Sequence, residues 1–468
     1  MSKRRLRVWN GTARAIVGVA LLGASAALGG GYAGELDTTF GGGTGIVTTS
    51  GMAFPVDVAI QSINGSQRYL VAGQTQGQTD YDGWDWAVLA YTPSGSLDQT
   101  FGEARDGIVR LFQTDPGRTV AYGVSLDEQN RVVTVGSSTV RTTGTGNYTG
   151  LTVVRQRADG FLDQTFNGTG IATVWAGSPD GYNEWGLSVV AVPASLGGGV
   201  LTAGVCCRVE SPARGRNPAV VKRHTFFAKF RDDGTLDTTF GPDRTGIAYD
   251  PRSSSPGSPW KGSLLLQRDG KIVVTGSLDF PAASPGYATD VFTPSYSWAL
   301  SRFKSDGTLD TTFGSKGRVI RNGARVKGGE VSATDDSIVA VGDGSTAGEA
   351  GGLVARYLKN GAPDLTFDLD GYAAVAGWAN GPADVVRQPD GRVVFSCQTL
   401  VGSAHYGLVG RFAVNGSPDP SFGGTGYTQP VASAWWRGVA EAADGIVVVG
   451  GAEPGFPGSS IFVARYGK

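Results

Sequence analysis

The chain has 468 residues, of which 74 are glycine, about twice the ordinary usage. The first thirty-three residues carry five basic and no acidic side chains, so 35 basic and 41 acidic residues remain after them, a net charge of about −6. A negatively charged chain is a poor ligand for a phosphate backbone, and we expect no nucleic-acid partner.

Residues 1–33 have the pattern of an export signal. Four of the first seven residues are basic, Ala15 to Leu28 contains no charge, and small residues follow. The alternative, a membrane anchor, would need about twenty apolar residues, more than this stretch provides. We therefore predict a signal peptide over 1–33, cut between Ala27 and Ala33, and a mature protein without a membrane span. The expected location is secreted, periplasmic or cell-surface.

One short motif, Leu/Pro-Asp-x-Thr/Ser-Phe, occurs seven times from there on and is called the repeat word below. Its copies are 54 to 74 residues apart, and their Phe residues are Phe40, Phe101, Phe166, Phe240, Phe313, Phe367 and Phe422. We expect the Asp to accept a hydrogen bond from the amide two residues later and the Phe to be buried. A calcium site is disfavoured, because each word offers one carboxylate.

Each repeat also predicts four short strands, a to d, joined by glycine-bearing turns. The fourth repeat shows strand a at Lys261 to Gln267, strand b at Lys271 to Thr275 and strand c at Trp298 to Phe303, and a short strand d is expected after each word. Seven such sheets bury their faces and leave no long free edge when they close radially. The prediction is an all-β fold, a seven-bladed β-propeller of four-stranded antiparallel blades, in one domain over 34–468.

The two ends of the repeat array predict how the ring closes. The mature chain opens with a word and an unpartnered strand d at Gly45 to Thr48, and it stops at a strand c, Phe462 to Tyr466. The N-terminal strand should therefore complete the last blade.

These repeats resemble the delta-60 repeat family, bacterial β-propellers of unknown function. The resemblance rests on copies of Asp/Asn-Gly-x-Leu-Asp-x-Thr-Phe-Gly followed by Gly-x-Val and covers Leu36 to Lys468. The last two copies depart from the motif, with Pro363 and Pro418 in place of Leu and Pro420-Ser421 in the middle of the word. The resemblance implies an exported bacterial propeller and brings no catalytic residue.

The sequence offers little for catalysis or metal binding. It has two histidines, His224 and His405, each just before a strand c, and no G-x-S-x-G, P-loop or C-x-x-C motif. Its three cysteines, Cys206, Cys207 and Cys397, form no disulfide framework, and a bridge from Cys397 to the other two is excluded by their separate blades. A strained vicinal bridge and free thiols both remain open for Cys206 and Cys207. We expect no cofactor and no metal.

Strand parity predicts two unlike faces of the ring. The a–b and c–d connections, with the tight turns and the words, form what we call the turn face. The b–c and d–a connections form the loop-rich face, where long loops are expected at Gly73 to Asp85, Gly136 to Gly150, Gly204 to His224 and Gly276 to Tyr296. Aromatic residues gather there, and Trp185, Trp260 and Trp436 are candidate ligand contacts, although any of them could instead fill gaps between blades.

Strand a lies nearest the propeller axis and supplies the other candidates. The matching positions are Asp57, Gly123, Gly186, Gly262, Gly329, Asp384 and Gly438. Asp57 and Asp384 flank the blade that holds Arg437, which favours a salt-bridged rim over a cation site.

Two functions follow from these features. The first is a non-enzymatic, monomeric binding or scaffold module that holds a protein or a glycan on the loop-rich face. The alternative is a carbohydrate-active hydrolase or lyase with its site in the central channel, where Asp57 and Asp384 would be paired carboxylates.

Overall fold

The structure is a computed structural model that describes residues 32–468 apart from 77–83, 112–118, 144–145, 177–183, 212–219, 252–261, 280–295, 347–348, 376–379, 402–403 and 453–459. The predicted signal peptide lies outside the described residues except for Tyr32 and Ala33. The Ala33 carbonyl already accepts a hydrogen bond from the Gly423 amide at 2.8 Å, and the Gly34 amide donates to the Gly467 carbonyl at 3.0 Å. The described fold therefore uses the last residue of the predicted leader.

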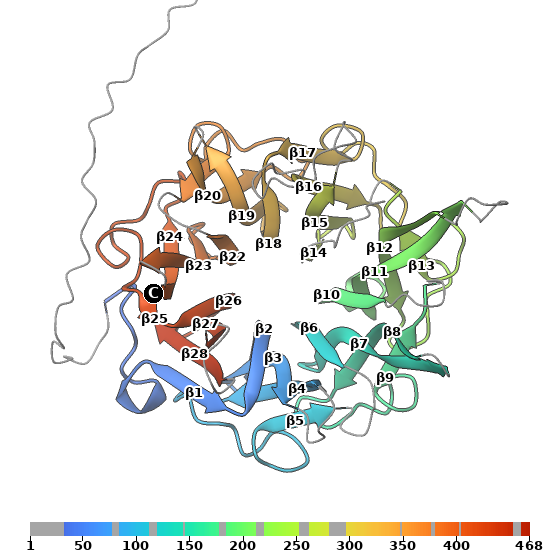
Figure 1. The fold of residues 1–468 in the computed structure, drawn as a ribbon, viewed down its shortest axis with the longest axis horizontal. Helices are drawn as coiled ribbons and strands as arrows, with labels where there is room; N and C mark the ends of the chain where they lie inside the picture. Colours follow the sequence, from blue (N-terminus) through green and yellow to red (C-terminus); the bar gives the residue numbers. More distant parts are fainter. Residues whose placement is uncertain are drawn as a thin grey trace, which may run out of the picture.

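In the described part of the chain, twenty-eight strands form seven four-stranded antiparallel sheets around a central axis (Figure 1). Blade 1 consists of β2 Met52–Ile63, β3 Ser66–Gln76, β4 Trp84–Tyr91 and β5 Ile108–Leu111. Blade 2 consists of β6 Val120–Leu126, β7 Val132–Thr143, β8 Gly146–Gln156 and β9 Ile171–Val174. Blade 3 consists of β10 Trp185–Ala191, β11 Val200–Ser211, β12 Val220–Phe230 and β13 Ile247–Tyr249. Blade 4 consists of β14 Leu264–Leu266, β15 Ile272–Asp279, β16 Tyr296–Phe303 and β17 Arg318–Asn322. Blade 5 consists of β18 Arg325–Val331, β19 Ile338–Thr346, β20 Glu349–Tyr357 and β21 Tyr372–Val375. Blade 6 consists of β22 Asn380–Arg387, β23 Val393–Val401, β24 Ala404–Phe412 and β25 Val431–Ala432. Blade 7 consists of β26 Ala434–Ala442, β27 Gly445–Ala452, β28 Ser460–Tyr466 and β1 Ile46–Ser50.

The described helices are single 3-10 turns, η1 Gly41–Gly43 and η2 Ala194–Leu196. No helix in the described part of the chain has the length and apolar character needed to cross a membrane. The predicted all-β, seven-bladed fold is confirmed.

The N-terminal strand closes the ring, as predicted. β1 pairs antiparallel with β28 over five residues, from Ile46 opposite Ala464 to Ser50 opposite Ser460. The Arg465 amide also donates to the Gly45 carbonyl at 3.0 Å. In Figure 1 the blue β1 and the red β28 lie side by side in one blade.

The repeat word has the predicted local structure in all seven copies. The Asp side chain accepts a hydrogen bond from the amide two residues later, at 2.9 to 3.1 Å, and the Phe is at most 1% exposed. Burial raises the pKa of Asp310, for example, but hydrogen bonds from Thr312 and the charge of Arg302 outweigh it, and the pKa ends below its ordinary value. These carboxylates are structural acceptors.

A basic side chain that the sequence reading did not single out completes each word. It lies one residue before the end of strand c and contacts the word's Asp at 2.7 to 3.1 Å, as Arg465, Arg155, Lys229, Arg302, Arg356 and Arg411. In blade 1 strand c has Ala90 at this position, and Arg68 of β3 reaches Asp98 instead. Except at Lys229, the guanidinium also lies over the word's Phe, at 4.5 to 5.2 Å from the ring centroid.

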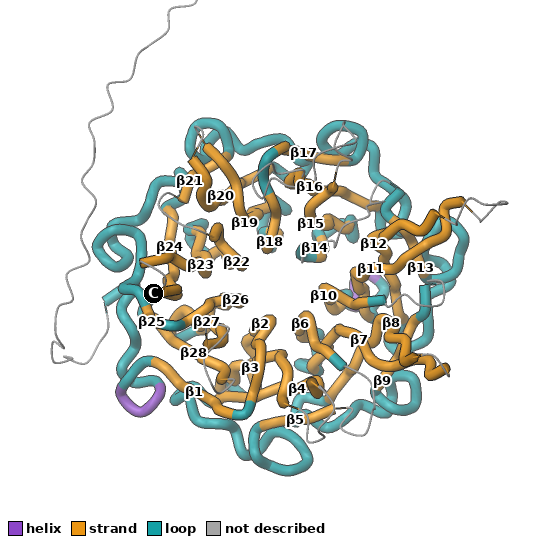
Figure 2. The backbone as a smooth tube through the Cα atoms, in the orientation of Figure 1, coloured by secondary structure: helices purple, strands orange, loops and turns teal. Residues whose placement is uncertain are grey.

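The apolar core lies between neighbouring blades. One cluster joins Tyr69 and Val71 of blade 1 to Val447 and Val463 of blade 7, and Phe40 of the first word plugs it. The same arrangement repeats around the ring, so no blade buries both of its faces alone. Figure 2 shows the strands of neighbouring blades side by side around the central axis.

Candidate functional site

The two predicted faces exist, but several expected loops are extensions of strands. β7 and β8 run as a ladder to Thr143 opposite Gly146, so most of the segment expected as a loop from Gly136 to Gly150 is sheet. β11 and β12 likewise continue to Ser211 opposite Val220. The wrong expectation came from Gly136 and Gly204, which lie inside strands and not at their ends.

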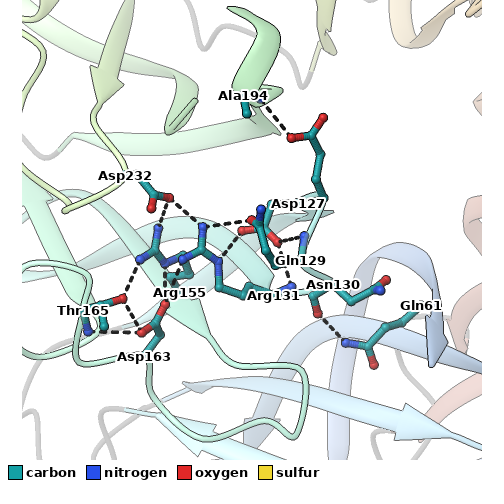
Figure 3. A network of polar contacts seen from close by, with 11 residues as sticks. Gln61, Asp127, Gln129, Asn130, Arg131, Arg155, Asp163, Thr165, Ala194 and Asp232 are labelled. Carbon is teal, nitrogen blue, oxygen red and sulfur yellow. Dashed lines mark hydrogen bonds and ion pairs between the residues drawn. The ribbon is translucent and has the colours of Figure 1, made fainter. Parts of the chain in front are cut away.

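Polar groups on the turn face are used to connect blades. In Figure 3, Asp232 of blade 3 accepts hydrogen bonds from Arg131 at 2.6 Å and from Arg155 at 2.8 Å, both of blade 2. Arg155 also bonds Asp163 of its own word, and the Gln61 amide of blade 1 donates to the Asn130 carbonyl at 2.7 Å. The charges drawn there satisfy one another, which assigns this part of the turn face to stability.

Around the channel, hydrogen bonds connect strand a of one blade to strand a of the next. A side-chain oxygen of one blade accepts a hydrogen bond from a backbone amide of the following blade at six consecutive junctions. The pairs are Asp57 with Val124, Ser125 with Ala191, Ser188 with Leu264, Ser263 with Gly329, Glu330 with Arg387 and Asp384 with Val439. Where a blade has Gly at the first acceptor position, as at Gly123, the residue two positions later makes the bond. At the junction of blades 7 and 1, Gly438 and Ala440 occupy both positions.

Three of the expected strand-a positions are corrected by this register. The residues that match Asp57 in blades 3, 4 and 5 are Ser188, Ser263 and Gly328 in place of Gly186, Gly262 and Gly329. The strands shift register between Gly186 and Ser188 and between Val326 and Gly328. A β-bulge adds one residue to a strand and cannot be counted from spacing alone.

Asp57 and Asp384 are therefore connectors between blades. The Asp57 carboxylate accepts from the Val124 amide at 3.0 Å and from the Val58 amide at 2.9 Å, and Asp384 accepts from the Val439 amide at 3.0 Å. Arg437 makes no ion pair with a carboxylate in the described residues, so the expected salt-bridged rim through Arg437 does not form there. No group of three or more His, Cys, Asp or Glu suited to a metal occurs among the residues that the structure describes.

A cavity of about 500 Å³ occupies the channel toward the turn face. Val, Leu, Ile and Ala of strands a line most of it, and Glu330 and Glu441 add two carboxyl groups. Burial raises the pKa of Glu330 to about 8, the hydrogen bond from the Arg387 amide opposes this change, and the Asp384 and Glu441 carboxylates reinforce it. Glu441 pairs with Lys468 at 3.0 Å. Neither Glu residue could be predicted as part of a site from the sequence, because nothing in the local sequence marks a Glu of strand a as buried.

The three tryptophan candidates lie in different environments. Trp436 is 0% exposed and packs against Gly407 in the core between blades 6 and 7, so the packing alternative holds for it. Trp185 begins β10 and is half-buried, with part of its surface open. Trp260 lies outside the described residues.

A second aromatic residue of blade 7, Trp435, is partly exposed at the loop-rich end of β26. Its ring stacks on His405 of blade 6, with centroids 5.1 Å apart and planes at 18°, and the Arg437 guanidinium carbon lies 5.9 Å from its centroid. Burial lowers the pKa of Arg437. This cluster brings together Arg437, which was predicted as a candidate, and two residues that were not. Their sequence positions could not reveal the contact, because it joins two blades.

The remaining polar candidates are buried. His224 lies inside β12 opposite Cys206, and both side chains are buried. Cys206 lies on β11 of blade 3 and Cys397 on β23 of blade 6, and both side chains are buried.

Two segments of the chain are similar to one family of propeller domains. Residues 286–313 and 333–367 match the family described as "Domain of unknown function (DUF5122) beta-propeller". No curated protein matches the sequence. Among solved structures, Drosophila Semaphorin 2a is similar with 9% identity and a TM-score of 0.47, covering 93% of this chain and 76% of that one. A polysaccharide lyase, PL25 ulvan lyase, matches with 10% identity and a TM-score of 0.43 over 89% and 94% of the two chains. A Trypanosoma rangeli sialidase mutant matches with 10% identity and a TM-score of 0.37 over 90% and 59%.

Proposed function

We propose that this protein is an exported, non-enzymatic binding or scaffold module that holds a protein or a glycan on its loop-rich face. The observation that carries the proposal is the use of Asp57 and Asp384 as acceptors for the amides of the next blade, at 3.0 Å each. A carboxylate that holds two blades together is poorly placed to act as a nucleophile or a proton donor. Asp57 and Asp384, the carboxylate pair expected for the enzymatic alternative, therefore have a structural role.

The contrast between the faces supports the choice of surface. The words and their arginines on the turn face are bonded to each other and to the neighbouring blade. Trp185 and Trp435, by contrast, keep open surface at the loop-rich ends of their strands. Aromatic side chains with one open side are the residues that most often anchor partners.

The test begins with a binding screen of the mature protein against cell-wall glycans and co-secreted proteins. For a ligand found in this way, Trp185→Ala should weaken binding about tenfold or more at an unchanged melting temperature. Trp436→Ala is the matched control, because its buried ring should affect the melting temperature first. Trp260→Ala extends the test to a residue outside the described structure. Full affinity in Trp185→Ala and Trp260→Ala would contradict the choice of face.

One observation favours a second candidate, a carbohydrate-active enzyme that uses the channel. Glu330, whose pKa is raised to about 8, and Glu441 line the same cavity, and a protonated carboxyl beside a second carboxylate is the arrangement that glycoside hydrolysis uses. This candidate stays second because Glu330 also accepts the Arg387 amide and so connects two blades, as Asp57 and Asp384 do. Incubation of the mature protein with polysaccharides, followed by reducing-end and unsaturated-product assays, tests it. Turnover that is lost in Glu330→Gln would replace the binding proposal with this one.

Export is part of the proposal and rests on the basic start and the uncharged stretch of residues 1–33. A cut just before Ala33 would keep the contact between its carbonyl and the Gly423 amide. N-terminal sequencing of secreted protein should find a start between residues 28 and 34. Material that begins at Met1 or Ser2 would contradict export with cleavage.

A further inference from the structure

Blades 5 and 7 each carry a cation at the same point of strand a. β18 shifts register between Val326 and Gly328, and β26 shifts between Trp436 and Gly438. The bulges leave Lys327 and Arg437 as the extra residues. Both lie near the loop-rich end of their strands, beside the mouth of the channel.

The two cations differ in what neutralises them. The Lys327 ammonium pairs with Asp343 at 2.6 Å and donates to the Gly381 carbonyl at 3.3 Å. Asp343 lies on β19 opposite Arg325, two positions before Lys327. The matching position on β27, opposite Trp435, is Gly451. Blade 7 therefore has no side chain where blade 5 places its counter-charge.

Arg437 is nevertheless partly withdrawn from water. It is half-buried, burial lowers its pKa, and its guanidinium lies over Trp435, which His405 supports from the neighbouring blade. No carboxylate among the residues that the structure describes forms an ion pair with it. Within the described residues the charge of Arg437 is therefore not neutralised. A partly buried charge without a partner costs stability, and an anionic ligand would offset that cost.

We propose that Arg437, positioned by Trp435, binds the carboxylate of an acidic sugar at the loop-rich mouth of the channel; this rests on the proposed function and names its ligand class. The planar guanidinium matches a carboxylate through two parallel hydrogen bonds. A peptide C-terminus is usually captured by several free backbone amides. Here the nearby Val439 amide is already bonded to Asp384 at 3.0 Å, which favours a sugar carboxylate bound by the side chain.

The structure offers a variant that installs the missing counter-charge. A Cβ added to Gly451 would lie 3.5 Å from the Pro55 side chain and 3.7 Å from the Ser460 carbonyl, which are ordinary contacts. Gly451→Asp should therefore fold and neutralise Arg437, as Asp343 neutralises Lys327. It removes the site by pairing the cation, and the cation itself stays in the protein.

The test measures binding of oligogalacturonate to the mature protein by calorimetry, with the same oligomer after reduction of its carboxyl groups as the neutral probe. The wild type should bind the acidic oligomer and bind the reduced one at least tenfold more weakly. Arg437→Met and Gly451→Asp should each weaken binding of the acidic oligomer about tenfold or more, because each removes the charge-assisted pair between the guanidinium and the sugar carboxylate. Lys327→Met, the matched control, should stay within about twofold of the wild type, because its charge is already paired.

Several results would overturn the inference. They are equal binding of the acidic and reduced oligomers, no binding of the acidic oligomer, or unchanged affinity in Arg437→Met or Gly451→Asp. Preference for a sulfated oligosaccharide or for a peptide with a free C-terminus would also reject the sugar carboxylate. A protein or neutral glycan that binds through Trp185 but not through Arg437 would leave the proposed function standing and reject this subsite.

Discussion

Replacing Arg302 by Met tests whether the basic residue of strand c holds blade and word together. The Arg302 side chain is 4% exposed and bonds Asp310 at 2.9 Å and Thr312 at 3.2 Å in its own blade. It also donates to the Lys359 carbonyl of blade 5 at 2.6 Å and lies 4.7 Å from the Phe313 centroid. Met keeps most of the apolar stem and removes every one of these polar contacts.

The expected cost follows from what the substitution leaves behind. Breaking a buried ion pair usually costs about 3–5 kcal/mol, because one charge stays buried without its partner. Asp310 would keep its hydrogen bonds from the Thr312 amide and hydroxyl, at 3.1 and 2.6 Å, so the lower end applies. We expect a loss of about 3 kcal/mol in the free energy of unfolding.

Equilibrium urea unfolding measures this loss, with Arg157→Met as the control. Arg157 pairs with Asp159 at 3.0 Å, but the two side chains are 55% and 48% exposed, and such surface pairs contribute about 0–1 kcal/mol. A double-mutant cycle with Asp310→Asn should give a coupling energy well above zero. Equal losses in Arg302→Met and Arg157→Met, or a coupling energy near zero, would refute the role assigned to the strand-c cation.

Three further predictions concern closure, the channel and backbone strain. Deleting Leu36 to Thr49 removes β1 except Ser50, together with the buried Phe40 and Asp37, the partner of Arg465. The loss should cost on the order of 5 kcal/mol and cause aggregation through the exposed edge of β28, and a monomer with an unaltered melting temperature would contradict closure. Folding raises the pKa of Glu330 from 4.5 to about 8, so its stabilising contribution is complete below about pH 4.5 and is lost as the pH rises to about 8. The Glu330→Gln variant should therefore equal the wild type in stability near pH 5 and exceed it by up to about 5 kcal/mol near pH 9. Urea unfolding at a series of pH values measures this difference, and parallel pH profiles would reject the raised pKa. Leu369 has φ 66° and is 89% exposed, so Leu369→Gly should relieve strain that no burial offsets and raise the free energy of unfolding by roughly 0.5 kcal/mol; a decrease in a urea titration would contradict this.

Most of the fold could be predicted from the sequence, because its signals are local. The Asp and Phe of the repeat word act within a few residues of each other, so Asp310 and Phe313 could be assigned their roles directly. Closure followed from the order of strands, because a chain that begins with strand d and ends with strand c can complete its last blade in one way. The cation of strand c was also visible, since Arg302, Arg356 and Arg411 each precede an aromatic residue, but a repeated Arg on a strand does not say what it contacts.

The candidate site was harder to predict because its geometry depends on neighbouring blades. Asp57 and Asp384 were found from the strand-a pattern, but their task as connectors depends on an amide of the following blade. Trp436 and Trp435 are adjacent in sequence and opposite in environment, and only the register of β26 decides which ring is buried. The bulge at Arg437 shifts that register, which is why spacing alone could not separate the two.

Amide hydrogen exchange of the mature protein, free and saturated with its ligand, tests the central claim that the loop-rich face is the binding surface. Binding through this face should slow exchange at the loop-rich ends of the strands, including the first residues of β10, β24 and β26, where Trp185, His405 and Trp435 lie. Exchange in the seven repeat words should stay unchanged, because they lie on the opposite face. Protection confined to the words and the tight a–b turns would contradict the account.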